Sequence, residues 1–113
     1  MPQYMLLLRD DPTVFQGLSP EEGQQVMKKY GDWRESLGKR ITAGNKLADG
    51  HGRVLQPKAG KTAVIDGPFA ESKEVMAGYF VLEADGYDQA VEVAKSCPHV
   101  AFGTIEIRQV ERT

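Results

Sequence analysis

The densest group of side chains that could do chemistry lies in one stretch, DGPFAESKE, at residues 66–74. Loops between strands often hold functional groups on a rigid scaffold. Asp66, with Lys73 or Glu74, could line a pocket as acid, base or substrate anchor. Alternatively, Asp66 caps its own turn, because Asp before Gly is a common turn pair. Both interpretations remain open.

A second charged group is predicted in the last strand and the first. Glu106 and Arg108 are two residues apart and therefore share a strand face. Arg9, near the end of the first strand, could join them. A charge taken out of water is costly unless it is paired. The cluster is therefore either a salt bridge across a dimer or an arginine that binds an anion and is held by a carboxylate.

The remaining candidates handle protons. His99 follows Pro98 before the last strand, and it could be a general base near physiological pH or make one structural hydrogen bond. Tyr79 could assist proton transfer. His51 lies in a glycine-rich turn and is expected to be solvated. Two histidines and one cysteine argue against a closed zinc site, and no phosphate loop or dinucleotide fingerprint is present. We therefore predict no metal and no cofactor.

The elements that position these residues begin with a central strand at residues 3–9, which is apolar on both faces. A helix should follow, with Ser19 as N-cap, Pro20 at the first helical position and Glu22 completing a capping box. Gly38 is its expected end. Its apolar stripe contains Val26, Tyr30, Trp33 and Leu37.

The middle of the chain predicts mainly strands. Residues 41–60 are read as a short hairpin that turns around residues 49–52, and a strand is expected at residues 61–66. The longest strand should span residues 74–83, where Gly78 indicates a bulge or a close backbone approach. A second helix, capped by Asp85, should end before Pro98, and a last strand should span residues 103–110.

This order predicts an α+β fold: one ferredoxin-like β-α-β-β-α-β domain over residues 1–113, with an inserted β-hairpin. Both helices should cover the same face of the sheet. The other face is partly apolar, and an uncovered apolar face usually finds a partner. We therefore expect a homodimer in which two sheets face each other.

Composition excludes several classes. The 113 residues carry 14 basic and 16 acidic side chains, a net charge of −2, which does not favour nucleic acid as a partner. The longest aliphatic run is four residues, far below the roughly 20 of a membrane span. A single cysteine cannot form an internal disulfide, which fits a cytoplasmic protein.

The loop motif and its flanks resemble a known family. DGPFAESKE, followed by Gly78-Tyr79-Phe80, is similar to the signature of the YCII-related proteins, specifically the DGPF-motif branch. The resemblance implies a dimeric α/β barrel with a pocket in each subunit. A His–Asp pair has been proposed as the site in the shorter YCII branch, with the histidine near the start of the first helix. This chain has no histidine there, so the resemblance carries over only Asp66.

Two functions follow as hypotheses, besides a third hypothesis of a dimeric barrel kept for assembly alone. The first is a small cofactor-independent isomerase or lyase that acts on a small acidic or aromatic metabolite. Asp66, His99 and Tyr79 would be catalytic, and Arg108, Arg9, Glu106 and Lys73 would bind the substrate. The second is a non-catalytic ligand-binding or regulatory module, because members of the DGPF-motif branch are often encoded beside extracytoplasmic-function sigma factors.

Overall fold

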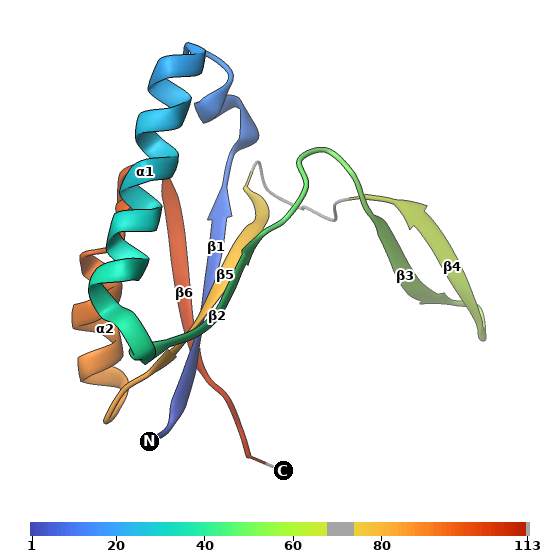
Figure 1. Cartoon of the computed structure of the whole chain (residues 1–113). Coiled ribbons are helices and arrows are strands. Elements are labelled where there is room, and N and C mark those ends of the chain that lie inside the picture. The colour runs from blue at the N-terminus through green and yellow to red at the C-terminus, as the bar shows by residue number, and fades with distance from the viewer. Residues whose placement is uncertain (68–73, 113) are drawn as a thin grey trace.

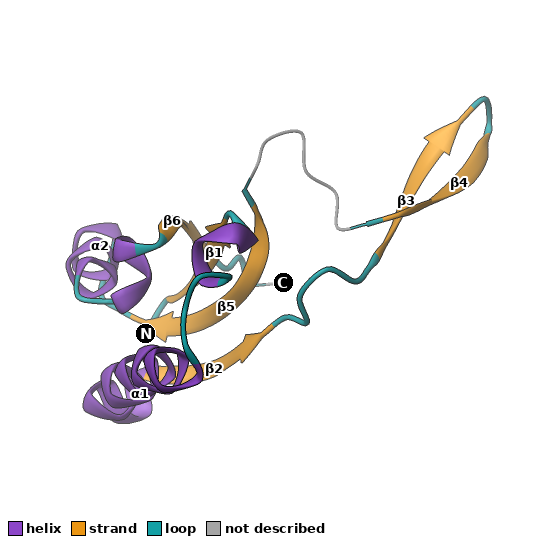
Figure 2. Ribbon diagram, turned by 90° about the horizontal axis from the view of Figure 1, so that it is seen from above, coloured by secondary structure: helices purple, strands orange, loops and turns teal. Residues whose placement is uncertain are grey.

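A computed structural model of the chain describes residues 1–67 and 74–112. Its main sheet is antiparallel, with strand order β2-β5-β1-β6. These strands span Gln3–Asp10 (β1), Ile41–Lys46 (β2), Val75–Glu83 (β5) and Gly103–Gln109 (β6). The helices are Pro20–Leu37 (α1) and Tyr87–Lys95 (α2). Both lie on the same face of the sheet (Figures 1 and 2), as predicted.

The first helix begins where its sequence signals place it. Ser19 accepts a hydrogen bond from the backbone of Glu22, and the Glu22 carboxylate accepts one from the backbone of Ser19. This capping box satisfies two amide donors that the first turn leaves unpaired. Trp33 is buried under the helix, and its indole Nε1 donates to Ser96 Oγ at 2.9 Å. The predicted apolar stripe therefore fixes α1 on the sheet.

The core lies between the helices and the inward face of the sheet. Inward residues of β1 and β5 alternate with outward ones, so every second side chain is buried. The buried apolar side chains are Tyr4, Leu6, Leu8, Trp33, Ile41, Phe80, Leu82, Ala84, Ala90, Ala94 and Cys97. Ile105 and Ile107 of β6 pack against this cluster, so they face the helices.

The predicted position of the hairpin is wrong. Residues 49–52 do not join two paired strands, because β2 pairs with β5 at the edge of the main sheet. The hairpin is formed instead by β3 (Arg53–Lys58) and β4 (Lys61–Asp66). Its turn has Ala59 and Gly60 at φ +51° and +77°. Two successive positive φ angles match the natural twist of paired strands, so the tight turn forms there.

This hairpin, which we call the arm (residues 53–66), stands away from the helices and the main sheet in both views (Figures 1 and 2). Its strands form a separate two-stranded sheet. At its base, the backbone N–H of Gly67 donates to the carbonyl oxygen of Gly52 at 3.0 Å. The strand predicted at residues 61–66 therefore exists, but it lies in the arm.

Two local predictions had different outcomes. Asp85 does not cap α2: Gly86 is at the cap position without a side-chain bond, and the Asp85 backbone donates to Gln89 Oε1 at 2.6 Å. At Gly78 both alternatives hold. The register of β5 shifts there against β1, and a Cβ atom on Gly78 would lie 2.8 Å from the carbonyl oxygen of Asn45. Only glycine lets β2 approach this closely.

The outward face of the sheet, which we call the open face, mixes apolar and charged side chains. Outward residues of β1 and β5 include Met5, Leu7 and Val81. Beside them, Glu106 accepts from Arg9 at 2.7 Å and from Arg108 at 3.3 Å. Hydrogen bonds from Arg9 and then Arg108 lower the pKa of Glu106. In the described residues, neither helix is long and apolar enough to cross a membrane.

The backbone around Gly103 leaves no room for a side chain. A Cβ atom there would collide with the carbonyl oxygen of Arg9, which belongs to the neighbouring strand. We expect Gly103→Ala to destabilise the fold by about 1–3 kcal/mol, as overpacking does. Urea unfolding measures this change. The control is Gly23→Ala in α1, where a Cβ atom meets nothing within 4 Å; it should add about 0.5–1 kcal/mol of stability. Equal effects of the two substitutions would contradict the account.

Candidate functional site

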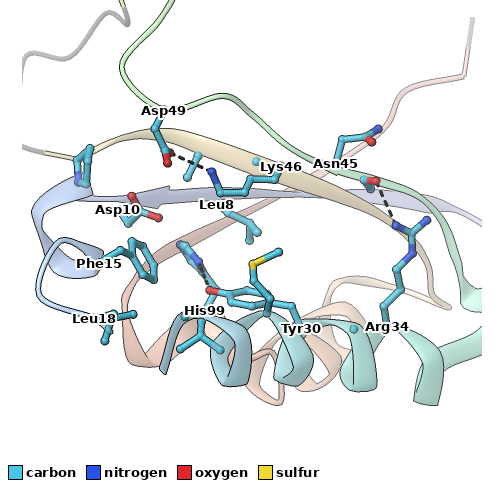
Figure 3. Close-up of a pocket in the computed structure, with 18 of the residues that line it drawn as sticks. Leu8, Asp10, Phe15, Leu18, Tyr30, Arg34, Asn45, Lys46, Asp49 and His99 are labelled. Carbon is cyan, nitrogen blue, oxygen red and sulfur yellow. Dashed lines mark hydrogen bonds and ion pairs between the residues drawn. The ribbon is translucent and has the colours of Figure 1, made fainter. Parts of the chain in front are cut away.

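A pocket of about 630 Å³ opens between α1 and the inward face of the sheet (Figure 3). This volume is within the usual range for small-molecule sites. Its walls are mainly apolar and include Leu8, Phe15, Leu18, Val26, Met27 and Phe80. Its polar side chains include Asp10, Ser19, Tyr30, Arg34, Asn45, Lys46, Asp49 and His99. An apolar cavity with a few converging polar groups is the usual form of a ligand site.

His99 is the best-defined polar group of the pocket. It lies in the short helical turn η3 (Pro98–Ala101), and only 2% of it is exposed. Its Nε2 lies 2.9 Å from the carbonyl oxygen of Arg9, and its Nδ1 lies 2.9 Å from the Tyr30 hydroxyl. A carbonyl oxygen only accepts, so Nε2 carries the hydrogen. In the neutral ring, Nδ1 then accepts from Tyr30. The surroundings thus select one tautomer.

Tyr30 reaches His99 from the apolar stripe of α1. Phe102 stacks against its ring, with centroids 6.5 Å apart. Burial raises the pKa of the Tyr30 hydroxyl well above its ordinary value of 10.0, so it holds its proton at neutral pH. The hydroxyl therefore donates to His99 and keeps its oxygen lone pairs for a second partner. Tyr30 can pass a proton between a pocket ligand and His99.

Asp10 supplies a buried carboxyl group at the same end of the pocket. It is the last residue of β1 and shares the inward face with Leu6 and Leu8, and only 5% of it is exposed. Burial raises the pKa of Asp10 above 3.8, while the nearby charge of His99 lowers it in part. A desolvated carboxyl near a histidine in a pocket is a typical feature of functional sites.

Charged groups also lie at the edge of the pocket. Lys46 Nζ lies 3.0 Å from Asp49 Oδ1, and Arg34 Nη1 donates to the carbonyl oxygen of Gly44 at 3.2 Å (Figure 3). The Lys46–Asp49 pair is more than half exposed, so solvent screens it. Lys46 can therefore reorient toward an anionic group of a ligand without losing a buried partner.

Of the predicted site residues that the structure describes, only His99 lines this pocket. The Asp66 side chain is 92% exposed at the base of the arm, where its Oδ1 lies 3.4 Å from Arg53 Nε. Tyr79 accepts from Asn45 Nδ2 at 3.0 Å and is an outward residue of β5. Arg9, Glu106 and Arg108 form the ion pairs of the open face. Lys73 lies outside the described residues.

Sequence reasoning missed Asp10 and Tyr30 as site residues. The alternation of side chains along the first strand could have identified Asp10. It comes two residues after Leu8 and therefore shares the helix-covered face. An acidic residue at a buried register position indicates function or pairing. Tyr30 was assigned to the core stripe, and nothing in the helical pattern separates a packing tyrosine from one that contacts a histidine.

Comparison with known proteins identifies the family. Residues 2–113 match the YCII-related domain, so the chain belongs to the YCII-related family. An uncharacterized protein of Rhizobium meliloti (strain 1021), R00369, is 28% identical over 110 residues, covering 93% of this chain and 89% of that protein. The predicted family is confirmed; its DGPF-motif branch stays a prediction.

A solved structure shares the fold. It is 5-chloro-2-hydroxyhydroquinone dehydrochlorinase (TftG) from Burkholderia phenoliruptrix AC1100, in complex with 2,5-dihydroxybenzoquinone. The TM-score is 0.57 at 14% sequence identity, and the similarity covers 98% of this chain and 95% of that chain. At this identity the similarity shows the fold, which agrees with the predicted ferredoxin-like architecture.

The buried carboxyl of Asp10 should be visible in the pH dependence of stability. Because burial raises its pKa in the folded chain, the unfolded chain ionises first as the pH rises. Wild type should therefore lose stability relative to Asp10→Asn as the pH rises from below 3.8 through the raised pKa. Urea unfolding of both proteins between about pH 3.5 and 7 measures the difference. Asp66→Asn, at an exposed carboxyl, is the control. A pH-independent difference for Asp10→Asn would contradict the burial argument.

Proposed function

We propose that this chain is a cofactor-independent enzyme that moves protons on a small, ring-sized metabolite bound in the pocket. The observation that carries the proposal is the hydrogen-bonded Tyr30–His99 pair, with the buried Asp10 beside it, in an apolar pocket of about 630 Å³. The pocket walls favour an apolar or aromatic body, and Lys46 and Arg34 favour an acidic substituent. Binding of a quinone by the structural neighbour supports this class.

The proposed chemistry follows from the donor order. A ligand proton moves to the Tyr30 oxygen while the Tyr30 proton moves to His99 Nδ1. Both nitrogens of the resulting imidazolium then donate, Nδ1 to Tyr30 and Nε2 to the carbonyl oxygen of Arg9. The Asp10 carboxylate stabilises the positive ring through its charge. Return of the proton to another ligand atom completes an isomerisation. In an elimination, the leaving group departs with its electron pair and takes up the proton that returns through Tyr30.

The proposal keeps His99 as a catalytic residue and replaces Asp66 by Asp10 as the acidic partner. It also includes the finer expectations for the whole chain: residues 1–113 form a single domain of the DGPF-motif branch, which is cytoplasmic and homodimeric through the open face. The apolar character of Met5, Leu7 and Val81 on that face supports the dimer. No observation favours the sigma-factor context, which stays a prediction.

Ligand binding is tested by a thermal-shift screen of small hydroxylated, carboxylated and quinonoid rings, including 2,5-dihydroxybenzoquinone. A ligand at a hundredfold excess over Kd should stabilise wild type by about 2.7 kcal/mol. Tyr30→Phe should bind the same ligand about tenfold more weakly, because one hydrogen bond is lost. Asp66→Ala, far from the pocket lining, should bind as wild type does. Loss of binding in Asp66→Ala but not in Tyr30→Phe would place the site in the arm instead.

The reaction type is tested by incubating each stabilising compound with the protein in D₂O and following its C–H signals by NMR. Wild type should catalyse deuterium exchange or conversion to an isomer. Tyr30→Phe loses an acid–base group and should be slower by about 10²-fold or more. Asp10→Asn loses the charge that stabilises the imidazolium and should also be slower. Tight binding with no exchange and no conversion by wild type would contradict the enzyme proposal and favour a ligand-binding module.

A further inference from the structure

The arm exposes apolar side chains that nothing in the described part of the chain covers. Leu55 and Val64 face each other across the two strands and are 66% and 65% exposed. On the other face of the arm, Val54 is paired with Ile65, which is also exposed. A solvated hairpin normally alternates apolar and polar residues. This one is apolar on both faces, which is typical of a strand pair inserted between two surfaces.

An isolated two-stranded sheet is marginally stable in water. The structure nevertheless gives the arm a defined shape: β3 and β4 pair over their full lengths, and the tip holds Ala59 at φ +51°. A left-handed conformation at a residue other than glycine costs roughly 1–2 kcal/mol. A regular, strained hairpin with exposed Leu and Val side chains needs a further contact to stabilise it.

The distribution of charge indicates which partner contacts the arm. The arm carries Arg53, Lys58 and Lys61 against Asp66, so its net charge is +2. The whole chain carries −2, and the remainder of the chain therefore carries −4. The arm and the remainder are thus complementary in charge, but they stand apart within one chain (Figure 1). The open face adds an uncovered apolar surface to that acidic remainder. A second copy supplies the missing surface to both arms at once, as a two-fold symmetric contact requires.

We propose that the arm is a dimerisation element: each arm packs against the main sheet and helices of a second copy of the chain. This inference rests on the homodimer proposed above and assigns it a structural element. The packing of the arm against a second copy also affects the pocket. Lys46 and Asp49, at the pocket edge, lie on the chain that leads into the arm. Packing of the arm on a partner therefore restrains the segment that carries Lys46 and Asp49 beside the ligand.

The test removes the apolar surface of the arm and preserves its strands. Leu55→Thr with Val64→Thr keeps β-forming residues and places a favourable Thr–Thr pair across the strands. Val14→Thr with Val100→Thr is the control, because these valines are also exposed but lie in short helical turns, outside the arm, the main sheet and helices α1 and α2. Sedimentation at micromolar concentrations distinguishes the 12.5 kDa monomer from a dimer of twice that mass.

Wild type and the control should be dimers. The dissociation constant of the arm-variant dimer should be higher by about a hundredfold or more, while its circular dichroism spectrum is unchanged. A monomeric wild type would overturn the homodimer itself. A wild-type dimer with an equally tight arm-variant dimer would overturn the assignment to the arm alone. Equal weakening in the control would also overturn it. None of these results bears on the proton chemistry of the pocket.

A photocrosslinker at position 55 gives an independent readout in which only that residue is changed. The chain carrying p-benzoylphenylalanine in place of Leu55 is mixed as isotope-labelled and unlabelled protein and then irradiated. We expect cross-links between a labelled and an unlabelled chain, in which position 55 is joined to residues of β1, β5, β6 or the helices. Cross-links found only within one chain would contradict the exchange of arms.

Discussion

The contacts of His99 with Arg9 and Tyr30 hold the functional end of this molecule together. One ring nitrogen donates to the backbone of β1, and the other accepts from a side chain of α1. Three segments far apart in sequence therefore meet at one imidazole. Because an unpaired buried polar group costs about 1–3 kcal/mol, each partner of His99 is constrained by the others. Gly103 belongs to the same constraint, since only a residue without Cβ lets β6 begin against the carbonyl oxygen of Arg9.

The pocket is the part of the fold where stability and function oppose each other. A leucine at position 10 would continue the apolar row of β1, whereas Asp10 puts a carboxyl group there whose ionisation is opposed by burial. Burying such a group lowers the stability of the fold, so its presence there indicates a function. The open face differs, because its Glu106 carboxylate is held by two arginines and its charges are already paired. This contrast favours the inward pocket over the open face as the site of chemistry.

Much of the fold could be predicted from local signals, whereas the site could not. The capping box at Ser19 and the two apolar faces of β1 are properties of short segments, and the structure confirms both. Strand partners depend on the whole sheet. Ile41 and Gly44 face inward where β2 pairs with β5 at the edge of the main sheet, whereas β3 pairs with β4. The arm holds Asp66, the first residue of the DGPF motif, away from the pocket, and the motif itself gave no indication of this.

The central claim is that a neutral His99 accepts the Tyr30 proton at Nδ1 and donates from Nε2. Long-range ¹H–¹⁵N NMR of histidine-labelled protein, at a pH where the ring is neutral, measures this directly. The account predicts a protonated Nε2 and a lone pair at Nδ1, with Tyr30→Phe shifting the Nδ1 signal and leaving Nε2 protonated. A hydrogen on Nδ1, or an Nδ1 signal unchanged by Tyr30→Phe, would contradict the proposed proton path.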